Sequence, residues 1–239
     1  MVMKILVIIP AYNEAKCILN TVNSLKEYMS VVDYIVINDG STDETEQILK
    51  QDNINHITLI ENLGIGGAVQ TGYKYAFYHD YDYAIQYDGD GQHDAKYIPD
   101  LIEGCYEGND IVVGSRFINN EGFQSTALRR IGIKLIAGTI HLLSGTKVTD
   151  TTSGFRIVNK EIIALFSKRY PDDFPESETT MMVLRQGYKF KEVPVIMKER
   201  VSGKSSISPF KSIYFIVKVM ISIVFSFIIN NKKAKELID

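Results

Sequence analysis

The sequence predicts an α/β protein with a mostly parallel sheet flanked by helices. Two observations support this prediction. Short apolar runs rich in β-branched residues alternate with helix-like stretches along the first half of the 239-residue chain, and such alternation is typical of βαβ units with right-handed crossovers. Polar and small residues follow these runs, at the carboxyl ends where parallel sheets hold their ligands.

The apolar runs are the expected strands of the sheet. They cover residues 5–9, 34–37, 57–60, 83–87 and 111–113. The helix-like stretches between them lie at about 15–29, 43–51, 66–79 and 96–105. Beyond the alternating half, helices are expected at 126–144, from Pro175 to near Gly187, and at 213–229, with a further strand after Gly187.

Composition places the chain among folded proteins with a substantial core, because 45% of residues are hydrophobic and 23% are charged. The net charge of -3 gives no reason to expect nucleic acid as a partner. Cys17 and Cys105 lie far apart without zinc-site spacing, which is typical of reduced thiols in a cytosolic protein. The apolar start is broken by Pro10, so it is interpreted as a first strand rather than a signal peptide.

The stretch AIQYDGDGQHD, residues 84–94, ends an apolar run in closely spaced aspartates. Like charges repel and are costly to desolvate, so a cation with a diphosphate behind it would offset the repulsion. Asp88 and Asp90 can reach one Mg²⁺ or Mn²⁺ ion or its waters, and Gln92 adds a neutral oxygen. Gly89 lets the backbone approach a bulky anion. A solvated Asp-Gly turn is the alternative, but the equally polar ends of the other strands favour a metal.

Other motifs have ordinary structural explanations. Asn13 can cap the helix after PAYNE, and Ser41 with Glu44 can form a capping box. His93 is expected to be a turn residue or an outer contact rather than a metal ligand. The sequence GIGGAV at 64–69 lacks the third glycine of a dinucleotide loop and follows the third strand rather than the first, so an NAD site is rejected.

The ordered motifs resemble those of the family 2 glycosyltransferases, and within them the dolichyl- or polyprenyl-phosphate sugar transferase branch. The matching pieces are VIIPAYNE, VINDGSTDET, NLGIGGAVQTGYKYA, QYDGDGQHD, VVGSRF, DTTSGFR, PESETTMMVLRQGYKFKEVPV and RVSGKSSI. They span residues 7 to about 207. The resemblance implies a GT-A fold with a Rossmann-like sheet, a nucleotide-sugar donor, Mg²⁺ or Mn²⁺ as cofactor, and inversion at the anomeric carbon.

The resemblance also implies roles for individual residues. The nucleoside pocket would be formed by Pro10, Ala11, Tyr12 and Glu14, with Asp39 accepting a hydrogen bond from the base. Metal and diphosphate would be held by Asp88, Gly89, Asp90 and Gln92. Phosphate and sugar would be contacted by Arg116, and phosphate by Arg200 and Lys204 on a closing loop. The sugar or the acceptor would lie near Ser153, Gly154, Phe155 and Arg156.

A carboxylate is also expected on the acceptor side. In the resembling branch a glutamate lies fourteen positions before the glutamate of the EVP strand, and Glu178 and Glu192 have this spacing. Glu178 therefore joins Asp90 and Arg116 as a candidate catalytic residue, with Glu176 second. Acidic residues also suit the first turn of a helix, which is the structural alternative. A hydroxyl acceptor needs a general base, whereas a polyprenyl phosphate does not.

The carboxyl third departs from the sheet pattern. Residues 126–144 resemble an amphipathic helix with a basic edge, which suits an anionic lipid surface, a phosphate or plain packing. Residues 213–229 are apolar but short of the roughly 20 residues that span a bilayer. Helical spacing places one polar stripe on this segment, at Tyr214, Lys218, Ser222 and Ser226. This pattern favours a helix lying in a membrane interface over one packed on the protein or on a second subunit.

The expected function is that of an inverting, metal-dependent glycosyltransferase at the cytoplasmic face of the cell membrane. It would move a sugar from a nucleotide-diphosphate donor, UDP favoured over GDP, to a lipid-linked acceptor in cell-surface glycan synthesis. Residues 1–207 would form the catalytic domain, and residues 208–239 a helix with a basic tail. The oligomeric state stays open, a homo-oligomer included.

Two other functions are weighed against this one. A sugar nucleotidyltransferase should carry a glycine-rich loop with a basic residue after the first strand, and IIPAYNEAK has no such loop. A catalytically silent nucleotide-sugar-binding module should have lost its carboxylates, whereas Asp88, Asp90 and Glu178 are present.

Overall fold

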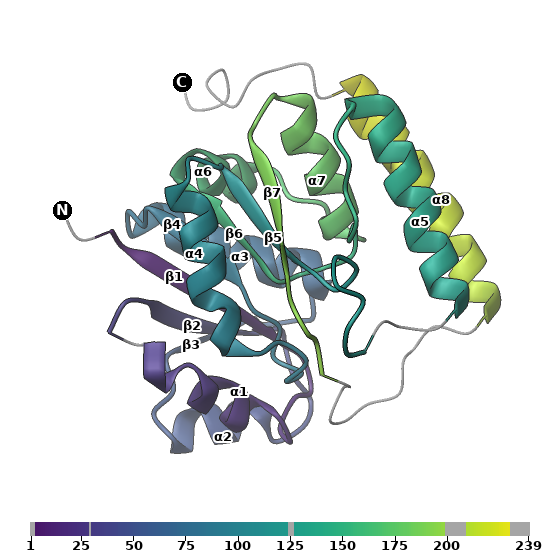
Figure 1. Cartoon of the computed structure of the whole chain (residues 1–239). Coiled ribbons are helices and arrows are strands. Elements are labelled where there is room, and N and C mark those ends of the chain that lie inside the picture. Colours follow the sequence, from purple (N-terminus) through teal and green to yellow (C-terminus); the bar gives the residue numbers. More distant parts are fainter. Residues whose placement is uncertain (1–2, 29, 124–126, 199–208, 230–239) are drawn as a thin grey trace.

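The computed structural model describes residues 3–28, 30–123, 127–198 and 209–229, which form a central sheet between helices (Figure 1). The sheet has seven strands in the order β3-β2-β1-β4-β6-β5-β7. They are β1 (Ile5–Ala11), β2 (Asp33–Asn38), β3 (His56–Thr58), β4 (Tyr83–Gln86), β5 (Ile111–Ser115), β6 (Arg156–Asn159) and β7 (Phe190–Pro194). Strand β6 is antiparallel to β4 and β5, and the other strand pairs are parallel. The predicted mostly parallel α/β sheet is confirmed.

The helices follow the predicted alternation. They are α1 (Ile18–Ser24), α2 (Thr45–Gln51), α3 (Gly64–Tyr78), α4 (Ile98–Tyr106), α5 (Ala127–Ser144), α6 (Lys160–Lys168), α7 (Pro175–Arg185) and α8 (Pro209–Ile229). Strand β6 and helix α6 were not predicted, because the motif DTTSGFR was interpreted as a site loop and not as a segment that leads into a strand. Residue 207, the expected end of the catalytic domain, lies outside the described residues.

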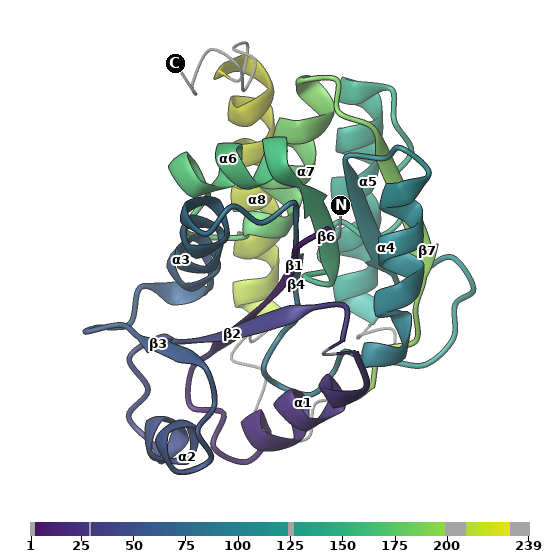
Figure 2. The same cartoon turned by 90° about the vertical axis from the view of Figure 1, so that its left-hand side faces the viewer.

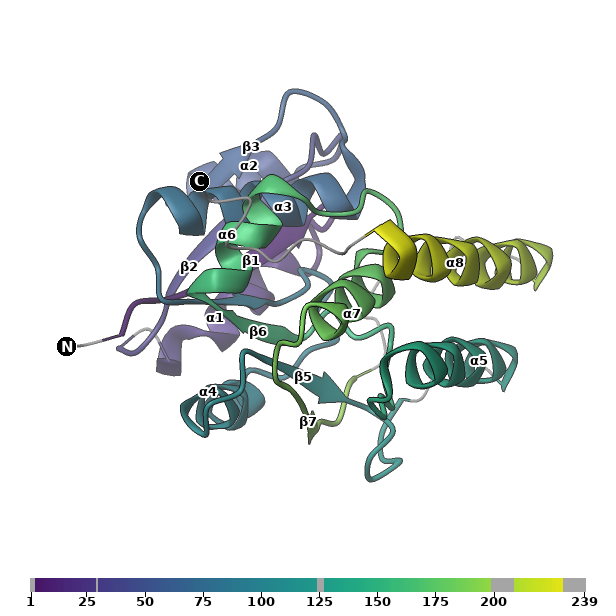
Figure 3. The same ribbon diagram turned by 90° about the horizontal axis from the view of Figure 1, so that it is seen from above.

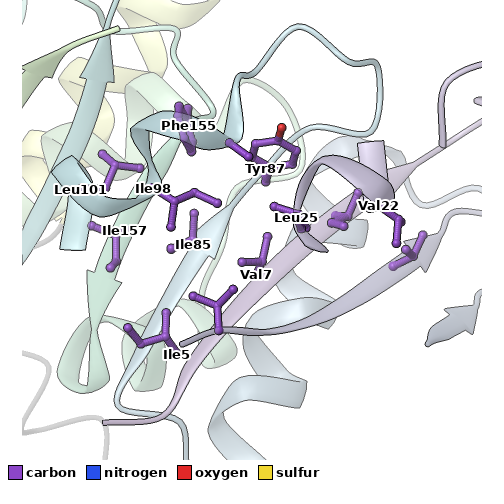
Figure 4. Packing of buried hydrophobic residues seen from close by; sticks show 14 of the residues in the cluster. Ile5, Val7, Val22, Leu25, Ile85, Tyr87, Ile98, Leu101, Phe155 and Ile157 are labelled. Atoms are coloured by element: carbon purple, nitrogen blue, oxygen red, sulfur yellow. The ribbon is translucent and has the colours of Figure 1, made fainter. Parts of the chain in front are cut away.

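Strand β1 divides the core into two layers, because its side chains alternate between the two faces of the sheet. Ile5, Val7 and Ile9 pack with side chains of α1 and α4 in one cluster, part of which Figure 4 shows. Leu6 and Ile8 pack with α3 and α6 in the other. In Figure 2, α3 and α6 lie on one side of β1 and β2, and α1 and α2 on the other. Both faces of the sheet are therefore covered, which leaves the strand ends for ligands.

A third apolar cluster joins α5, α7 and α8. It contains Ile136 and Ile140 of α5, Met181 of α7, and Val219 and Ile223 of α8. Figures 1 and 3 show α5 and α8 side by side at one end of the molecule. Helix α8 thus packs on the protein by one face. No helix in the described part of the chain has both the length and the apolarity that crossing a bilayer requires.

The two helix caps considered as structural alternatives, at Asn13 and at Ser41 with Glu44, do not form. Helix α1 begins at Ile18 after Cys17, and α2 begins at Thr45 after Glu44, neither with a side-chain cap at the residue before it. Asn13 and Ser41 instead bond to each other's loop, because the Asn13 side chain accepts from Thr42 N–H at 2.8 Å and Ser41 Oγ accepts from Asn13 N–H at 3.0 Å. These polar side chains fasten the loop after β1 to the loop after β2.

Candidate active site

Three strand ends meet at the carboxyl edge of the sheet. The Gly89 N–H donates to the Pro10 carbonyl at 3.2 Å, and the Asp39 N–H donates to the Ala11 carbonyl at 2.8 Å. A Cβ on Gly89 would stand 2.8 Å from the Pro10 carbonyl oxygen, so the close approach of these loops requires glycine. The loops after β1, β2 and β4 therefore lie together, as their polar residues predicted.

Asp88 follows β4 at this edge, with 33% of its side chain exposed. Its Oδ1 accepts from Gln86 Nε2 at 3.2 Å, and its backbone N–H donates to His93 Nδ1 at 3.0 Å. His93 Nε2 stands 3.6 Å from Asp88 Oδ2, and the ring stacks on Phe155 at 4.9 Å. Gly154 also lies close to the carboxylate, because a Cβ there would stand 3.0 Å from both oxygens. The loop before β6 thus reaches Asp88.

Asp90 is almost fully buried, and its Oδ1 accepts from the Gln92 N–H at 3.0 Å. Gln92 is fixed in turn to the segment after β7, because its Nε2 donates to the Lys198 carbonyl at 3.2 Å. In the described ranges no three His, Cys, Asp or Glu side chains gather as metal ligands. Two carboxylates and an amide nevertheless fit a Mg²⁺ or Mn²⁺ ion that keeps waters and takes phosphate oxygens from a substrate.

Asp39 is held in a fixed orientation at the start of α3. Its Oδ1 accepts from the Leu63 N–H at 2.7 Å, and its carbonyl accepts from Asn62 Nδ2 at 3.2 Å. Burial raises the pKa of the Asp39 carboxyl, although the N–H groups of Leu63 and Gly64 favour its ionised form. A buried acceptor fixed in this way suits recognition of an N–H group on a ligand.

The remaining residues predicted for the nucleoside pocket lie along the same loop. Pro10 and Ala11 are buried in β1, whereas Tyr12 is 46% exposed. Tyr12 and Glu14 line an open groove between this loop and α2, together with Asp43. Tyr12 is thus available to a ligand in this groove, which Asp39, Asp88 and Asp90 do not line.

Arg116 follows β5 and is clasped by Asp150, whose side chain is completely buried. Arg116 Nε donates to Asp150 Oδ2 at 2.7 Å, and Nη2 donates to Asp150 Oδ1 at 2.8 Å and to Thr152 Oγ1 at 2.7 Å. Burial lowers the pKa of Arg116, but the bonds to Asp150 outweigh it, and the charges of Asp88 and Glu176 raise it further. Arg116 therefore lies within the electrostatic reach of Asp88 and Glu176.

The residues of the loop before β6 differ in what their side chains contact. Phe155 is buried between His93 and Tyr87, and Figure 4 shows it beside Tyr87. Ser153 Oγ and Thr151 Oγ1 are buried without a hydrogen-bond partner in the described part of the chain. Two orphaned hydroxyls beside Gly154 mark this loop as a place where a ligand could supply the missing partners.

Arg156 is an internal residue with no exposed surface. Its Nε donates to the Ser153 carbonyl at 3.2 Å. Its Nη1 donates to the Glu176 carbonyl at 3.2 Å and to Thr179 Oγ1 at 3.0 Å. Arg156 thus ties the loop before β6 to the first turn of α7. We assign it to the support of the acceptor-side loop rather than to direct contact with an acceptor.

Glu176 and Glu178 face different parts of the molecule. Burial and the negative charge of Asp88 raise the pKa of Glu176, whereas the charge of Arg156 and a hydrogen bond with Gln86 lower it. The Glu176 carboxyl therefore lies near Asp88, one of the candidate metal ligands. Burial also raises the pKa of Glu178, but its hydrogen-bond partner is Ser222 of α8. The structure therefore brings Glu176, rather than Glu178, to the cluster around Asp88. Arg200 and Lys204 lie outside the described residues.

Three residues that reach the site were not predicted from the sequence. Gln86 lies inside β4 and bonds Asp88, Asp150 clasps Arg116, and Glu192 of β7 accepts the N–H groups of Thr149 and Asp150. The acidic residue at the start of DTTSGFR and the glutamate in EVP were visible signals. They gave no indication of their partners, because these contacts join separate strands and loops.

A family model shows which family the chain belongs to. Residues 6–166 match the model described as Glycosyl transferase family 2. The chain belongs to this family. The predicted membership and the predicted glycosyltransferase activity are thereby confirmed.

Two relatives of this family 2 glycosyltransferase are named for lipid-phosphate acceptors. The UDP-N-acetylglucosamine--dolichyl-phosphate N-acetylglucosaminyltransferase of Methanococcus voltae is 33% identical over 215 residues, 80% of this chain and 84% of that protein. The undecaprenyl-phosphate mannosyltransferase of Micrococcus luteus is 27% identical over 219 residues, 86% of this chain and 88% of that protein.

A solved structure confirms the predicted GT-A fold. Glucosyl-3-phosphoglycerate synthase from Mycobacterium tuberculosis, in complex with Mn²⁺, uridine-diphosphate and phosphoglyceric acid, superposes with a TM-score of 0.71. The match covers 94% of this chain and 78% of that chain at 18% sequence identity. At this identity the likeness shows the fold alone.

Proposed function

We propose that this family 2 glycosyltransferase moves a sugar from a UDP-sugar to a polyprenyl-phosphate acceptor. The proposal rests on the close approach of Gly154 to the Asp88 carboxylate, which brings the predicted donor and acceptor loops together. The names of the relatives support the acceptor class, and one of them names a UDP-sugar donor.

On the donor side, the nucleoside lies against the loops after β1 and β2. Asp39 accepts a hydrogen bond from the base, since its carboxylate is fixed by the Leu63 N–H. The diphosphate lies near Asp88, Asp90 and Gln92, the residues that would hold a Mg²⁺ or Mn²⁺ ion. A bound ion of this kind neutralises charge on the leaving diphosphate. Arg116 adds a positive charge on the same side, and Arg200 and Lys204 remain predicted phosphate contacts.

On the acceptor side, the loop containing Ser153 and Gly154 faces the sugar. The phosphate oxygen of the lipid attacks the anomeric carbon from the face opposite the diphosphate, which inverts the configuration. A polyprenyl phosphate is already ionised near neutral pH, so this attack needs no general base. The contact of Glu178 with Ser222 is consistent with such an acceptor, and Glu176 is the acidic residue that lies nearer to the reaction.

The lipid acceptor requires access to a membrane, and we place that contact on α5 and α8. The outward residues of α8 are apolar and well exposed, namely Val217, Ile221, Val224, Phe225 and Ile228. Ile131, Leu135 and Leu142 continue this apolar surface on α5. The polar residues Lys218 and Ser222 instead bond to Asp173 and Glu178 of the protein. Helices that turn polar groups inward and apolar groups outward suit a lipid interface.

A donor and acceptor screen tests the proposal. The purified full chain is incubated with UDP-N-acetylglucosamine, UDP-glucose or GDP-mannose, and with vesicles containing undecaprenyl phosphate, in Mn²⁺, Mg²⁺ or EDTA. We expect nucleoside diphosphate release and a glycolipid product with a UDP-sugar, only when a divalent ion is present.

Vesicles that contain undecaprenol in place of its phosphate provide the matched control for the acceptor. Turnover with the alcohol but not with the phosphate would contradict the proposed acceptor. Turnover with GDP-mannose alone would contradict the proposed donor, and undiminished turnover in EDTA would contradict the metal.

A further inference from the structure

Asp150 and Glu192 form a chain of contacts that ends on Arg116. Asp150 binds Arg116 at two points, through Nε and Nη2, and also accepts the Arg116 backbone N–H at 3.2 Å. Thr152 Oγ1 accepts a second bond from Nη2 at 2.7 Å. Two of the three guanidinium nitrogens are thereby committed, so the orientation of the planar group is fixed.

Glu192 holds the loop that carries Asp150. Its Oε1 accepts from the N–H groups of Thr149 at 3.0 Å and of Asp150 at 2.8 Å. Its Oε2 accepts from the N–H of Thr149 at 2.8 Å and from Thr149 Oγ1 at 2.9 Å. Thr149 Oγ1 also bonds Ser115 Oγ at 2.7 Å, directly before Arg116. One carboxylate of β7 thus fastens the loop to the end of β5.

The surroundings explain why Arg116 needs such a clasp. Only 12% of its side chain is exposed, and the negative charges of Asp88 and Glu176 act on it. A long cationic side chain held by nothing else would pair with the nearest carboxylate, because charge-assisted bonds are strongest where water is excluded. Pairing with Asp88 would occupy a candidate metal ligand and remove the positive charge from the diphosphate.

We propose that Asp150 and Glu192 are positioning residues that hold Arg116 away from Asp88 and leave its remaining edge for the donor diphosphate. Asp150 sets the plane of the guanidinium, and Glu192 sets the backbone that carries Asp150. The inference rests on the proposed function, because it assigns Arg116 to the diphosphate of the nucleotide-sugar donor.

The first test needs no ligand. The Arg116 Nε–H signal in a ¹⁵N–¹H NMR spectrum is assigned by its loss in Arg116→Lys. We expect a sharp, slowly exchanging signal in the wild type and a broadened or shifted one in Glu192→Gln, since an amide cannot accept at both of the original oxygen positions. Glu107→Gln is the matched control, because Glu107 pairs with the neighbouring Lys191 of β7 at the surface.

The second test separates phosphate binding from nucleoside binding. Calorimetry with Mn²⁺ measures the affinity of each variant for UDP and for uridine. We expect Glu192→Gln to weaken UDP binding by roughly fivefold to tenfold, about the worth of one ordinary hydrogen bond, and to leave uridine binding unchanged. In the Arg116→Lys background the same substitution should have little further effect, because the two act through one contact.

The outcomes distinguish this inference from the proposed function. Wild type that binds neither UDP nor uridine with Mn²⁺ would overturn the donor assignment and the inference with it. Wild type that binds UDP, with Glu192→Gln equal to it in affinity and in the Arg116 signal, would overturn the positioning role alone. Equal weakening of UDP and uridine, undiminished in the Arg116→Lys background, would show a general structural role instead. Asp150→Asn provides a second variant that acts on Arg116 directly.

Discussion

Gly154 lies so close to Asp88 that a methyl group at residue 154 would stand 3.0 Å from both carboxylate oxygens and 2.6 Å from Gln86 Nε2. The substitution Gly154→Ala must therefore push the Asp88 carboxylate aside. We expect Mn²⁺-dependent UDP binding, measured by calorimetry, to weaken by roughly tenfold or more, which corresponds to about 1.4 kcal/mol.

Gly138→Ala is the matched control for this substitution. Gly138 lies within α5, and nothing surrounds the position that its Cβ would take. Alanine there should leave UDP binding unchanged and raise the melting temperature, because glycine inside a helix costs about 0.8–1.0 kcal/mol relative to alanine. Unchanged UDP binding in Gly154→Ala would contradict the place given to Asp88.

The aspartates of the DGDGQHD turn should differ in their effects. Asp88→Asn and Asp90→Asn each remove a carboxylate from the candidate metal site, so we expect Mn²⁺-dependent UDP binding and turnover to be lost while the circular dichroism spectrum is retained. Asp94→Asn should retain both, because Asp94 caps a short turn through the Lys96 N–H and asparagine can still accept that bond. Full activity in either of the first two variants would disprove the metal assignment.

Glu178→Gln reports on the chemistry of the acceptor. If the acceptor is a polyprenyl phosphate, we expect turnover in the vesicle assay to fall only a few-fold, since no proton is removed from a phosphate during attack. A loss of at least about 10²-fold would mean that the acceptor is a hydroxyl and that Glu178 is its general base. Glu176→Gln should reduce turnover more than Glu178→Gln, because the charge of Glu176 acts on both Arg156 and Asp88.

The pH dependence of stability should change in Glu178→Gln. Burial holds the pKa of Glu178 above its ordinary value, so the native state binds this proton more tightly than the unfolded state does. Ionisation then reduces the free energy of unfolding as the pH rises above the unfolded pKa of about 4.3. We expect the melting temperature of Glu178→Gln, relative to wild type, to increase as the pH rises from 4 to 7.

Glu46→Gln should show the opposite trend in the same scans. A hydrogen bond with Lys50 holds the pKa of Glu46 below its ordinary value, so its ionised form favours the native state. Removing the carboxyl should therefore lower the relative melting temperature as the pH rises from 4 to 7. Parallel trends in the two variants would contradict the pKa directions.

The outward face of α8 should govern membrane binding. Ile221→Glu together with Ile228→Glu places two charges on this exposed apolar surface, and we expect binding to anionic vesicles in a flotation assay to fall at least about tenfold. Ile60→Glu is the control, because Ile60 is fully exposed in the loop after β3. Point substitutions suit this test better than deletion of α8, since deletion would uncover Ile136 and Met181. Vesicle binding that survives the double substitution would contradict the place given to α8 in the membrane contact.

The sequence by itself determined the sheet except for strand β6, and the edge of the sheet at which the candidate site residues gather. Strands such as Ile5–Ala11 are visible because hydrophobicity and β-branching act within a few residues. Asp39, Asp88 and Asp90 were assigned to one edge because parallel strands carry their carboxyl ends to the same side. These inferences need only local pattern and the general rules of α/β folds.

Only the tertiary structure decided which side chains meet. Glu176 and Glu178 are two residues apart on one helix and so point about 200° apart, and the packing of α7 on α8 decided which of them faces Asp88. Asp150 bonds Arg116, which lies 34 positions earlier in the sequence, and Glu192 bonds Thr149, which lies 43 positions earlier. Such contacts depend on how separate elements are placed in space, which hydrophobic periodicity and motif spacing do not encode. The same holds for α8, where Lys218 and Ser222 turn toward the protein because Asp173, just before α7, and Glu178 of α7 lie beside them.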